Sequence, residues 1–170
     1  MKKLFPIIIA VAFGMTACDS KPSQYTPYIS LSYFYLNPIF DNGKIISAED
    51  TLNVHTVDGL LVLDTITMQD TVVFAAGYGS IGNDLVSARV MFDTTQVNMR
   101  ASLSEDITKI LLPISDIRNL QLFINPGYLY VSIPLGYRPL QQGTHRMQFV
   151  VESDSQFSPR SVTYFQPVKE

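Results

Sequence analysis

Short runs of alternating apolar and polar residues, separated by turn residues, recur along most of this 170-residue chain. The clearest run follows Gly143, where Met147, Phe149 and Val151 alternate with polar side chains. Successive side chains of a strand point to opposite faces, so the run predicts a strand with one buried face. Turn signals recur about every eight to twelve residues without alternating helices, which predicts an all-β fold, an antiparallel β-sandwich of about seven to nine strands.

Several other segments have the composition of strands. They span residues 28–36, 51–56, 60–63, 71–76, 86–92 and 161–166. The segment 60–63 is almost wholly apolar, which predicts either a central strand covered on both faces or a strand of the sandwich core. In 86–92, the side chains of Val86, Ala88, Val90 and Phe92 are expected to face inward. The glycines from Gly77 onward are expected to end the strand before them.

Three local signals concern the connections between strands. Asp41-Asn42-Gly43 is a turn sequence, and Asn125-Pro126-Gly127 predicts a hairpin that joins strands at 120–124 and 128–134. Ser104 precedes two acidic residues and can cap a short helix that runs toward Pro113. The β-branched residues of the same segment also permit a strand, so both alternatives stay open.

The first residues of the chain have the features of an export signal. Lys2 and Lys3 precede an apolar run at 4–13, and Met15-Thr16-Ala17 leads to Cys18. The run is shorter than the ~20 apolar residues that a transmembrane helix requires. This pattern resembles a bacterial lipoprotein signal, and the resemblance implies cleavage after residue 17 and attachment of lipid to Cys18. Two or three acyl chains would hold such a protein stably on a membrane.

This signal also predicts how the chain is divided and where the protein resides. Residues 18–27 are polar and contain Pro22 and Pro27, which predicts a semi-rigid tether before a single domain at 28–170. We expect the protein to be lipid-anchored in the bacterial cell envelope, at the outer membrane. Asp19 resembles an inner-membrane retention signal in enterobacteria and part of a surface-export signal in Bacteroidetes, so the membrane face stays open.

The end of the chain carries a second resemblance. A Gly143-Thr144 start, an alternating strand, a Ser153-Asp154 loop and a closing strand at 161–166 resemble the end of an immunoglobulin-like domain. The layout of the whole chain is similar to the small lipid-anchored Ig-like domains common in gut Bacteroidetes. This resemblance implies an Ig-like β-sandwich, although the core cysteines and the tryptophan of antibody domains are absent.

Charge and cysteine content narrow the possible partners. Loss of Lys2 and Lys3 with the signal leaves ten basic residues against fifteen acidic ones. Nucleic-acid binding requires clustered basic residues, so no nucleic-acid partner is expected. Cys18 is the only cysteine, so no disulfide can form within the chain, and the fold depends on packing.

No catalytic constellation is evident among the titratable residues. His55 and His145 are the only histidines. His55 can be paired with Asp58 or Asp64 and with Ser47, but no serine lies in a glycine-flanked nucleophile turn. Both histidines are therefore interpreted as polar strand residues or hydrogen-bonded inner residues. Zinc motifs are absent too, so we expect no enzyme activity, no metal and no cofactor.

Acidic residues offer two weaker alternatives. Asp41-Asn42-Gly43 and Asn83-Asp84 can supply oxygen ligands to a cation, but both lack the ligand spacing of a calcium loop and are good turn sequences. Asp64, Asp70 and Asp93 lie beside strand ends and are the candidates for a pair of glycosidase carboxylates. Turns and structural carboxylates are the preferred interpretations.

Aromatic residues give the best candidate for a binding site. Tyr33 and Tyr35 are expected to share one strand face, with Phe34 on the other, and Tyr128 is expected to share a face with Tyr130. Exposed tyrosines can stack on sugar rings or anchor a protein partner. The structural alternative is that they form cross-strand pairs that stabilise a sheet.

These observations favour a noncatalytic, lipid-anchored envelope protein that binds a protein or glycan partner. One alternative is a small β-barrel that carries an apolar ligand in its interior. Another is a subunit of a surface fibre or envelope complex, in which an apolar edge strand at 28–36 pairs with a neighbouring molecule.

Overall fold

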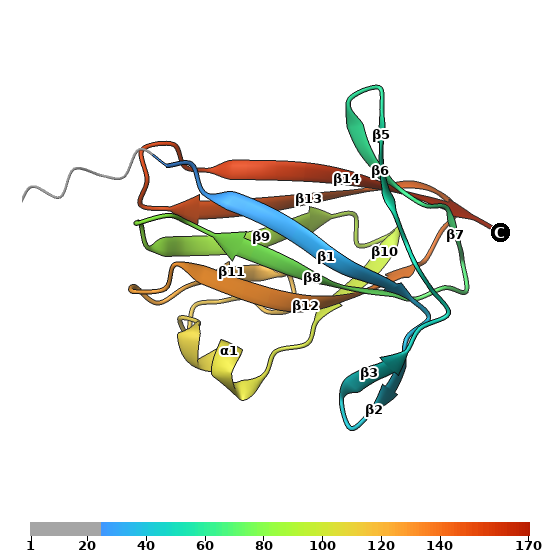
Figure 1. Cartoon of the computed structure of the whole chain (residues 1–170), viewed down its shortest axis with the longest axis horizontal. Coiled ribbons are helices and arrows are strands. Elements are labelled where there is room, and N and C mark those ends of the chain that lie inside the picture. The colour runs from blue at the N-terminus through green and yellow to red at the C-terminus, as the bar shows by residue number, and fades with distance from the viewer. Residues whose placement is uncertain (1–24) are drawn as a thin grey trace, which may run out of the picture.

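The structure is a computed structural model that describes residues 25–170, and the all-β sandwich prediction is confirmed. Two sheets face each other across a shared core (Figure 1). The predicted signal peptide and Cys18 lie outside the described residues. At the start of the described chain, Pro27 is buried and the Ser155 hydroxyl donates a hydrogen bond of 2.8 Å to the Tyr25 carbonyl. The end of the predicted tether therefore packs against the domain.

The first sheet has five antiparallel strands in the order β10-β12-β8-β1-β4. These strands are β1 (Tyr28–Leu36), β4 (Asp50–Thr51), β8 (Val72–Gly79), β10 (Val97–Ala101) and β12 (Tyr130–Pro139). We call it the five-stranded sheet. Its central strand, β8, pairs with β1 on one side and with β12 on the other.

The second sheet has the order β11-β9-β13-β14-β6-β5, with β7 also paired to β14. Its strands are β5 (Val54–Val57), β6 (Leu60–Leu63), β7 (Ile66–Thr67), β9 (Leu85–Phe92), β11 (Gln121–Phe123), β13 (Gly143–Ser153) and β14 (Arg160–Lys169). We call it the seven-stranded sheet. Its pairs are antiparallel, except that β6 and β7 run parallel to β14.

Aromatic side chains fill the centre of the core. Phe34 and Phe74 stack with ring centroids 5.1 Å apart, and Phe149 meets the rings of Phe74 and Tyr164 edge-on at 6.0 and 5.9 Å. Edge-to-face and offset pairs suit the charge distribution of aromatic rings. The alternation predicted after Gly143 is confirmed, because Met147, Phe149 and Val151 are all buried.

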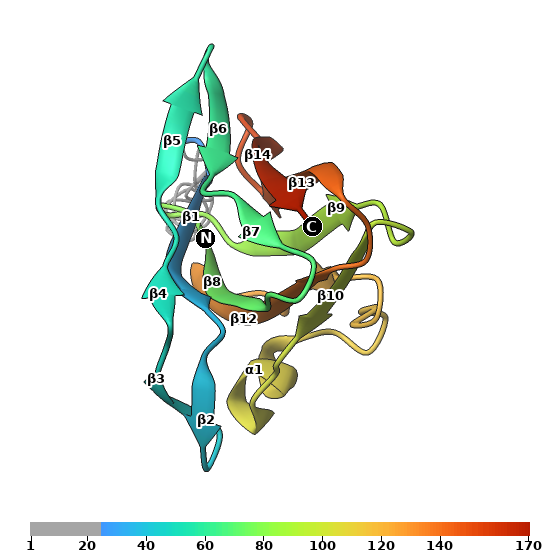
Figure 2. The same ribbon diagram turned by 90° about the vertical axis from the view of Figure 1, so that its right-hand side faces the viewer.

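Two hairpins extend beyond the body of the sandwich. They are β2 (Ile39–Asp41) with β3 (Lys44–Ser47), and β5 with β6. Figure 2 shows them at opposite ends of one side of the molecule, with β4 between them. The predicted turn at 41–43 is confirmed, since Asn42 and Gly43 at the tip of β2–β3 have positive φ angles of 48° and 76°.

The prediction that Leu60–Leu63 is covered on both faces is wrong. Leu60 is 50% exposed and only Leu63 is fully buried. The strand leaves the sandwich as one arm of the β5–β6 hairpin (Figure 1), so only its last residue is buried in the core between the two sheets. The segment 51–56 is also interrupted, because β4 ends at Thr51 and β5 begins at Val54.

Two further strands differ from their predicted form. β8 does not end before Gly77 but continues through Gly77 to Gly79, paired with β1 and β12. In β9, a register shift against β13 places Val86 on the exposed face and Leu85 in the core. A β-bulge reverses the alternation at its position, which periodicity alone does not reveal.

The segments around Asn125-Pro126-Gly127 do not form the predicted hairpin. Leu122 of β11 pairs with β9 in the seven-stranded sheet, whereas Tyr130 of β12 pairs with β8 in the five-stranded sheet. The Gly127 N–H donates to Asp84 Oδ2 at 2.9 Å, which ties the turn to the loop before β9. The turn therefore crosses from one sheet to the other.

The segment after β10 contains the helix that the sequence left open. The helix α1 (Glu105–Ile110) begins at Ser104, whose Oγ accepts a hydrogen bond of 3.3 Å from the Ile107 N–H. This cap satisfies one of the free donors at the helix start. The helix ends at Ile110, three residues before Pro113.

The closed-barrel alternative is wrong. Each of the two main sheets has two terminal strands rather than closing on itself, with β10 and β4 at the edges of the five-stranded sheet. Within residues 25–170, no helix has the length and apolar character that crossing a bilayer requires.

Candidate binding site

The structure brings Tyr33 and Tyr35 together on the outer face of the five-stranded sheet. Their rings stack with centroids 6.1 Å apart and planes at 11°. Tyr33 is 67% exposed, whereas Phe34 between them is buried in the core. Tyr33 has a positive φ of 61° where the register of β1 shifts between Ser32 and Tyr35. The bulge thus holds a bulky residue in a sparsely populated conformation, which is common at functional positions.

An apolar depression of about 220 Å³ adjoins these rings. We call it the tyrosine pocket, and it is lined by Tyr33, Tyr35, Ile45, Val73, Phe74, Ala75 and Pro134. Its residues come from β1, β8, β12 and the β2–β3 hairpin. The sequence did not identify Ile45 and Pro134 as site residues, because they are distant from the tyrosines along the chain.

Tyr130 lies near the opposite end of the same face. Tyr130 and Tyr28 both pair in register with Gly79 of β8. A Cβ atom on Gly77 would lie 2.6 Å from the Tyr130 hydroxyl oxygen, and one on Gly79 would overlap the Tyr28 ring. The two glycines therefore give space for aromatic rings to lie across the central strand.

The predicted tyrosine pairs do not form one continuous surface. Tyr35 pairs with Val73 and Tyr130 with Gly79, six residues farther along β8. At 3.4 Å per residue, the two positions are about 20 Å apart. Tyr33 and Tyr35 line the tyrosine pocket, whereas Tyr28 and Tyr130 belong to a separate cluster whose rings pack over glycine.

Tyr128 does not follow the predicted alternation. It precedes the first residue of β12, and its carbonyl accepts a hydrogen bond of 2.9 Å from the Leu85 N–H. Leu129, which was expected in the core, is 46% exposed, while Val131 and Ile133 are buried as predicted. Strand geometry begins only at Tyr130, so alternation does not apply to the two residues before it.

His55 pairs with one of its predicted aspartates. Its Nε2 atom lies 2.6 Å from Asp64 Oδ1 at the base of the β5–β6 hairpin. The Asn53 backbone N–H and the His55 ring both lower the pKa of Asp64. Within residues 25–170, no hydroxyl forms a hydrogen bond with His55.

His145 is a hydrogen-bonded inner residue, as one of the predicted alternatives held. Its Nδ1 atom lies 2.6 Å from the Tyr137 hydroxyl, and both side chains are almost fully buried. Burial lowers the pKa of His145 and raises that of Tyr137. This pair spans the two sheets, since Tyr137 belongs to β12 and His145 to β13.

The aspartates considered as glycosidase acids accept local hydrogen bonds. The side chain and backbone of Thr95 lower the pKa of Asp93. At Asp70, partial burial raises the pKa of the carboxyl group. Hydrogen bonds from Thr67 and Asn37 lower it by more, so the pKa lies below its usual value. The pKa of Asp64, Asp70 and Asp93 is lowered, whereas a glycosidase general acid typically has a raised pKa.

The candidate cation loops act as structural connections. Asp41-Asn42-Gly43 forms the tip of β2–β3, and Asp84 accepts the Gly127 N–H. Within residues 25–170, no group of three or more His, Cys, Asp or Glu side chains is placed to hold a metal ion.

Comparison with known proteins gives no family assignment. No protein-family model matches the chain, and no curated protein matches it by sequence. Among solved structures, it is similar to the cupredoxin domain of amoB from Nitrosocaldus yellowstonii, at 17% identity over 60% of this chain and 57% of that chain, with a TM-score of 0.36.

Two further solved structures are similar to this chain. A family 123 glycoside hydrolase from Clostridium perfringens is 14% identical over 85% of this chain and 28% of that chain, with a TM-score of 0.38. The PapD-like domain 7 of human CEP192 is 8% identical over 78% of this chain and 99% of that domain, with a TM-score of 0.36. This chain therefore spans little more than half of the first of these three structures and about a quarter of the hydrolase.

Proposed function

We propose that this protein is a noncatalytic, lipid-anchored module of the bacterial cell envelope that binds a protein partner through the tyrosine pocket and the β2–β3 hairpin. The proposal is carried by the stacked rings of Tyr33, which is exposed, and Tyr35, which is half-buried, beside an apolar depression. Rigid aromatic side chains provide a large contact area with little loss of conformational freedom, and they often dominate binding energy.

The surroundings of the pocket favour a protein over a glycan. Sugar hydroxyls require polar partners, but apart from the two tyrosine hydroxyls the pocket side chains are apolar. Three apolar side chains of the adjoining hairpin, Ile39, Phe40 and Ile46, are 52–64% exposed. Such a cluster on a projecting element is suited to the apolar side chains of another protein.

The direction of β1 supports an anchored arrangement. The described chain begins at one end of the sandwich, and β1 leads to the opposite end, where β2–β3 projects (Figure 1). An anchor at Cys18 would therefore present the tyrosine pocket on the side away from the membrane. We place the protein at the outer membrane because of the resemblance of the signal to a lipoprotein signal.

Metabolic labelling tests the anchor. Cells that express the full chain are supplied with a radioactive or alkyne-bearing fatty acid, in parallel with a Cys18→Ala variant. We expect label on the native chain and none on the variant, which would also leave the membrane fraction. A native protein without label would refute the anchor.

Site-directed crosslinking in intact cells tests the binding surface. A photoreactive phenylalanine replaces Phe40, which is 52% exposed, or Phe157, a 49% exposed control near the start of the domain. We expect a discrete protein adduct from position 40 alone, and its loss when Tyr33 and Tyr35 are replaced by serine.

Three outcomes would contradict the proposal. Equal adducts from both positions would show that the tyrosine pocket is not selective. Glycan binding that depends on Tyr33 and Tyr35, without any protein adduct, would assign the site to a carbohydrate. Turnover in a hydrolase screen would refute the noncatalytic role.

A further inference from the structure

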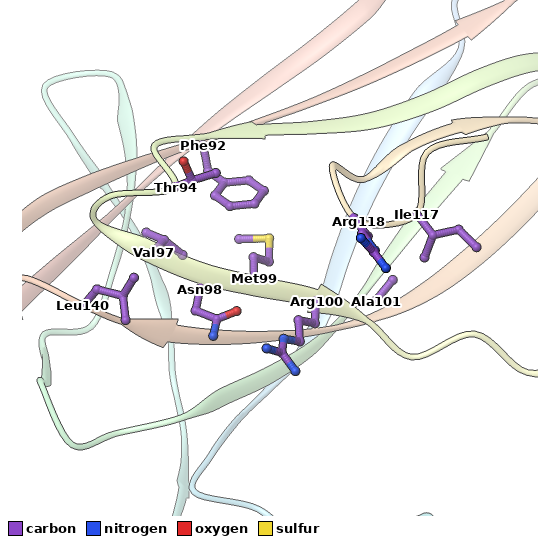
Figure 3. Close-up of a pocket in the computed structure, with 10 residues that line it drawn as sticks. All are labelled: Phe92, Thr94, Val97, Asn98, Met99, Arg100, Ala101, Ile117, Arg118 and Leu140. Atoms are coloured by element: carbon purple, nitrogen blue, oxygen red, sulfur yellow. The ribbon is translucent and has the colours of Figure 1, made fainter. Parts of the chain in front are cut away.

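A second surface, remote in sequence from the tyrosines, lies along the edge of β10. It is a cleft of about 640 Å³ between this strand and the loop that carries Ile117 and Arg118 (Figure 3). All five residues of β10, Val97–Ala101, line it. Because successive side chains point to opposite faces of a sheet, a cavity that touches every residue of a strand lies against the edge of that strand.

Among residues 25–170, β10 pairs with no strand on this edge, which leaves main-chain hydrogen-bonding groups available. Hydrogen bonds from Leu140 N–H to the Gln96 carbonyl and from Ser102 N–H to the Pro134 carbonyl fix its register with β12. In an antiparallel pair, every second residue bonds to the partner strand. The main-chain N–H and C=O groups of Asn98 and Arg100 therefore point toward β12. Those of Met99 and Ala101 point toward the cleft.

The side chains of the cleft divide by polarity. Phe92, Val97 and Met99 form an apolar floor, on which Val97 and Met99 are almost fully buried. Figure 3 shows Arg100 and Arg118 toward the end of the cleft that is opposite Leu140. Among the described residues, neither guanidinium group forms an ion pair.

The acidic group of Asp116 lies near Arg118. Asp116 accepts hydrogen bonds from the side chain of Asn119 and from the backbone of Arg118 and Asn119. The positive charge of Arg118 contributes to the lowered pKa of Asp116, after the hydrogen bonds from Asn119. Asp116 is thus engaged in its own loop, and both guanidinium groups keep their donors available.

We propose that this cleft binds an extended acidic segment of another protein, which adds to β10 as a further antiparallel or parallel strand. Main-chain bonds to Met99 and Ala101 would hold the segment, apolar side chains would cover the floor, and a glutamate or aspartate side chain would meet Arg100 and Arg118. In strand addition of this kind, main-chain hydrogen bonds provide the affinity, and contacts of alternate side chains provide the specificity.

A second copy of this chain does not suit the same edge. In two-fold pairing of β10 with itself through Met99 and Ala101, each Arg100 lies directly opposite or diagonal to its counterpart. Like charges at these positions destabilise a strand pair, and Arg118 adds to the repulsion. The charge of the edge therefore selects an acidic partner of a different sequence.

The test uses capped eight-residue peptides in which valine alternates with glutamate, glutamine or lysine. The soluble domain from Ser20 onward is titrated with each peptide by isothermal calorimetry or fluorescence anisotropy. We expect the glutamate peptide to bind at least about tenfold more tightly than the glutamine peptide, since a charge-assisted contact contributes more than 1.4 kcal/mol, and the lysine peptide not to bind.

Matched variants locate the site. Arg100→Gln and Arg118→Gln should each remove most of the advantage of the glutamate peptide, whereas Arg160→Gln, an exposed arginine of β14, should not. N-methylation of alternate peptide nitrogens should abolish binding if the main chain pairs with β10. Circular dichroism confirms that each variant is folded.

Three results would overturn the proposal. They are equal affinity for the glutamate and glutamine peptides, full binding of the N-methylated peptide, and binding that persists in both arginine variants. If decanoate alone binds and depends on the same arginines, the cleft is a site for a small amphiphilic anion and not for a peptide strand.

Discussion

The sandwich body and the β2–β3 hairpin are built from similar residues but differ in what covers them. Phe149 in β13 is fully buried between the two sheets, whereas Phe40 in β2 is 52% exposed. Both occupy strands rich in apolar side chains. A strand can bury its apolar face only where a second layer lies opposite, and the two-stranded hairpin has none. The exposed apolar residues of the hairpin are therefore available to a partner.

The largest expected effect separates these two phenylalanines. Phe149→Ala removes a ring that packs edge-on against Phe74 and Tyr164, and we expect a loss of about 3–5 kcal/mol in the free energy of unfolding. Denaturant titration of the soluble domain measures it. A loss below about 1 kcal/mol would show that the aromatic core is not what stabilises the body.

A smaller effect on the free energy of unfolding is expected from the protonation of His145. Burial holds the pKa of His145 below its usual 6.5, although the charge of Asp93 opposes this. The unfolded state then binds a proton that the folded state resists, so stability is full above about pH 6.5 and falls as the pH decreases below it, by at most ~1.4 kcal/mol per pH unit.

Unfolding curves between pH 7.5 and 5 test this dependence. His145→Gln should flatten it, whereas His55→Gln, a change on the projecting β5–β6 hairpin, should leave the contribution of His145 in place. A slope that survives in His145→Gln would place its origin elsewhere.

A still smaller change in the free energy of unfolding is expected from a substitution on the outer face of the five-stranded sheet. Gly79→Ala would push a methyl group into the ring of Tyr28, and we expect a loss of about 1 kcal/mol after the entropic benefit of replacing glycine. The loss should shrink in a Tyr28→Ala background. An equal loss in both backgrounds would mean that the ring does not need the space above Gly79.

The smallest effect belongs to the exposed hairpin side chains. Phe40→Ala is expected to change the free energy of unfolding by less than about 0.5 kcal/mol, because a half-exposed residue without an opposing layer loses little on truncation. The same variant should weaken partner binding. A loss comparable to that of Phe149→Ala would remove the distinction between the two regions.

Local patterns predicted the body of the fold and failed where a strand leaves it. The alternation after Gly143 identified β13 because both of its faces have a fixed environment. Leu60–Leu63 was misread as a central strand, since an apolar run does not reveal whether the rest of the chain covers it. The turn at 125–127 was recognised, but its crossing between sheets was not, because β11 and β12 pair with different strands that are distant in the sequence.

The candidate site was predicted in part for the same reason. Strand periodicity placed Tyr33 and Tyr35 on one face, but Ile45 and Pro134 reach the pocket only through tertiary structure. The edge of β10 gave no signal in the sequence, because an edge is a property of strand order. Gly77 and Gly79, two residues apart, were the one pattern that could have indicated rings lying across a strand.

Removal of the β2–β3 hairpin tests most directly whether that element serves a partner and not the fold. The Glu49 N–H donates to the Leu36 carbonyl at 2.9 Å, so the chain leaves and returns at the same place, and two glycines can replace residues 39–47. We expect the shortened chain to keep its free energy of unfolding within about 1 kcal/mol. A photoreactive residue at position 33 should then lose its protein adduct in cells. Unfolding of the shortened chain, or an undiminished adduct, would contradict this division of roles.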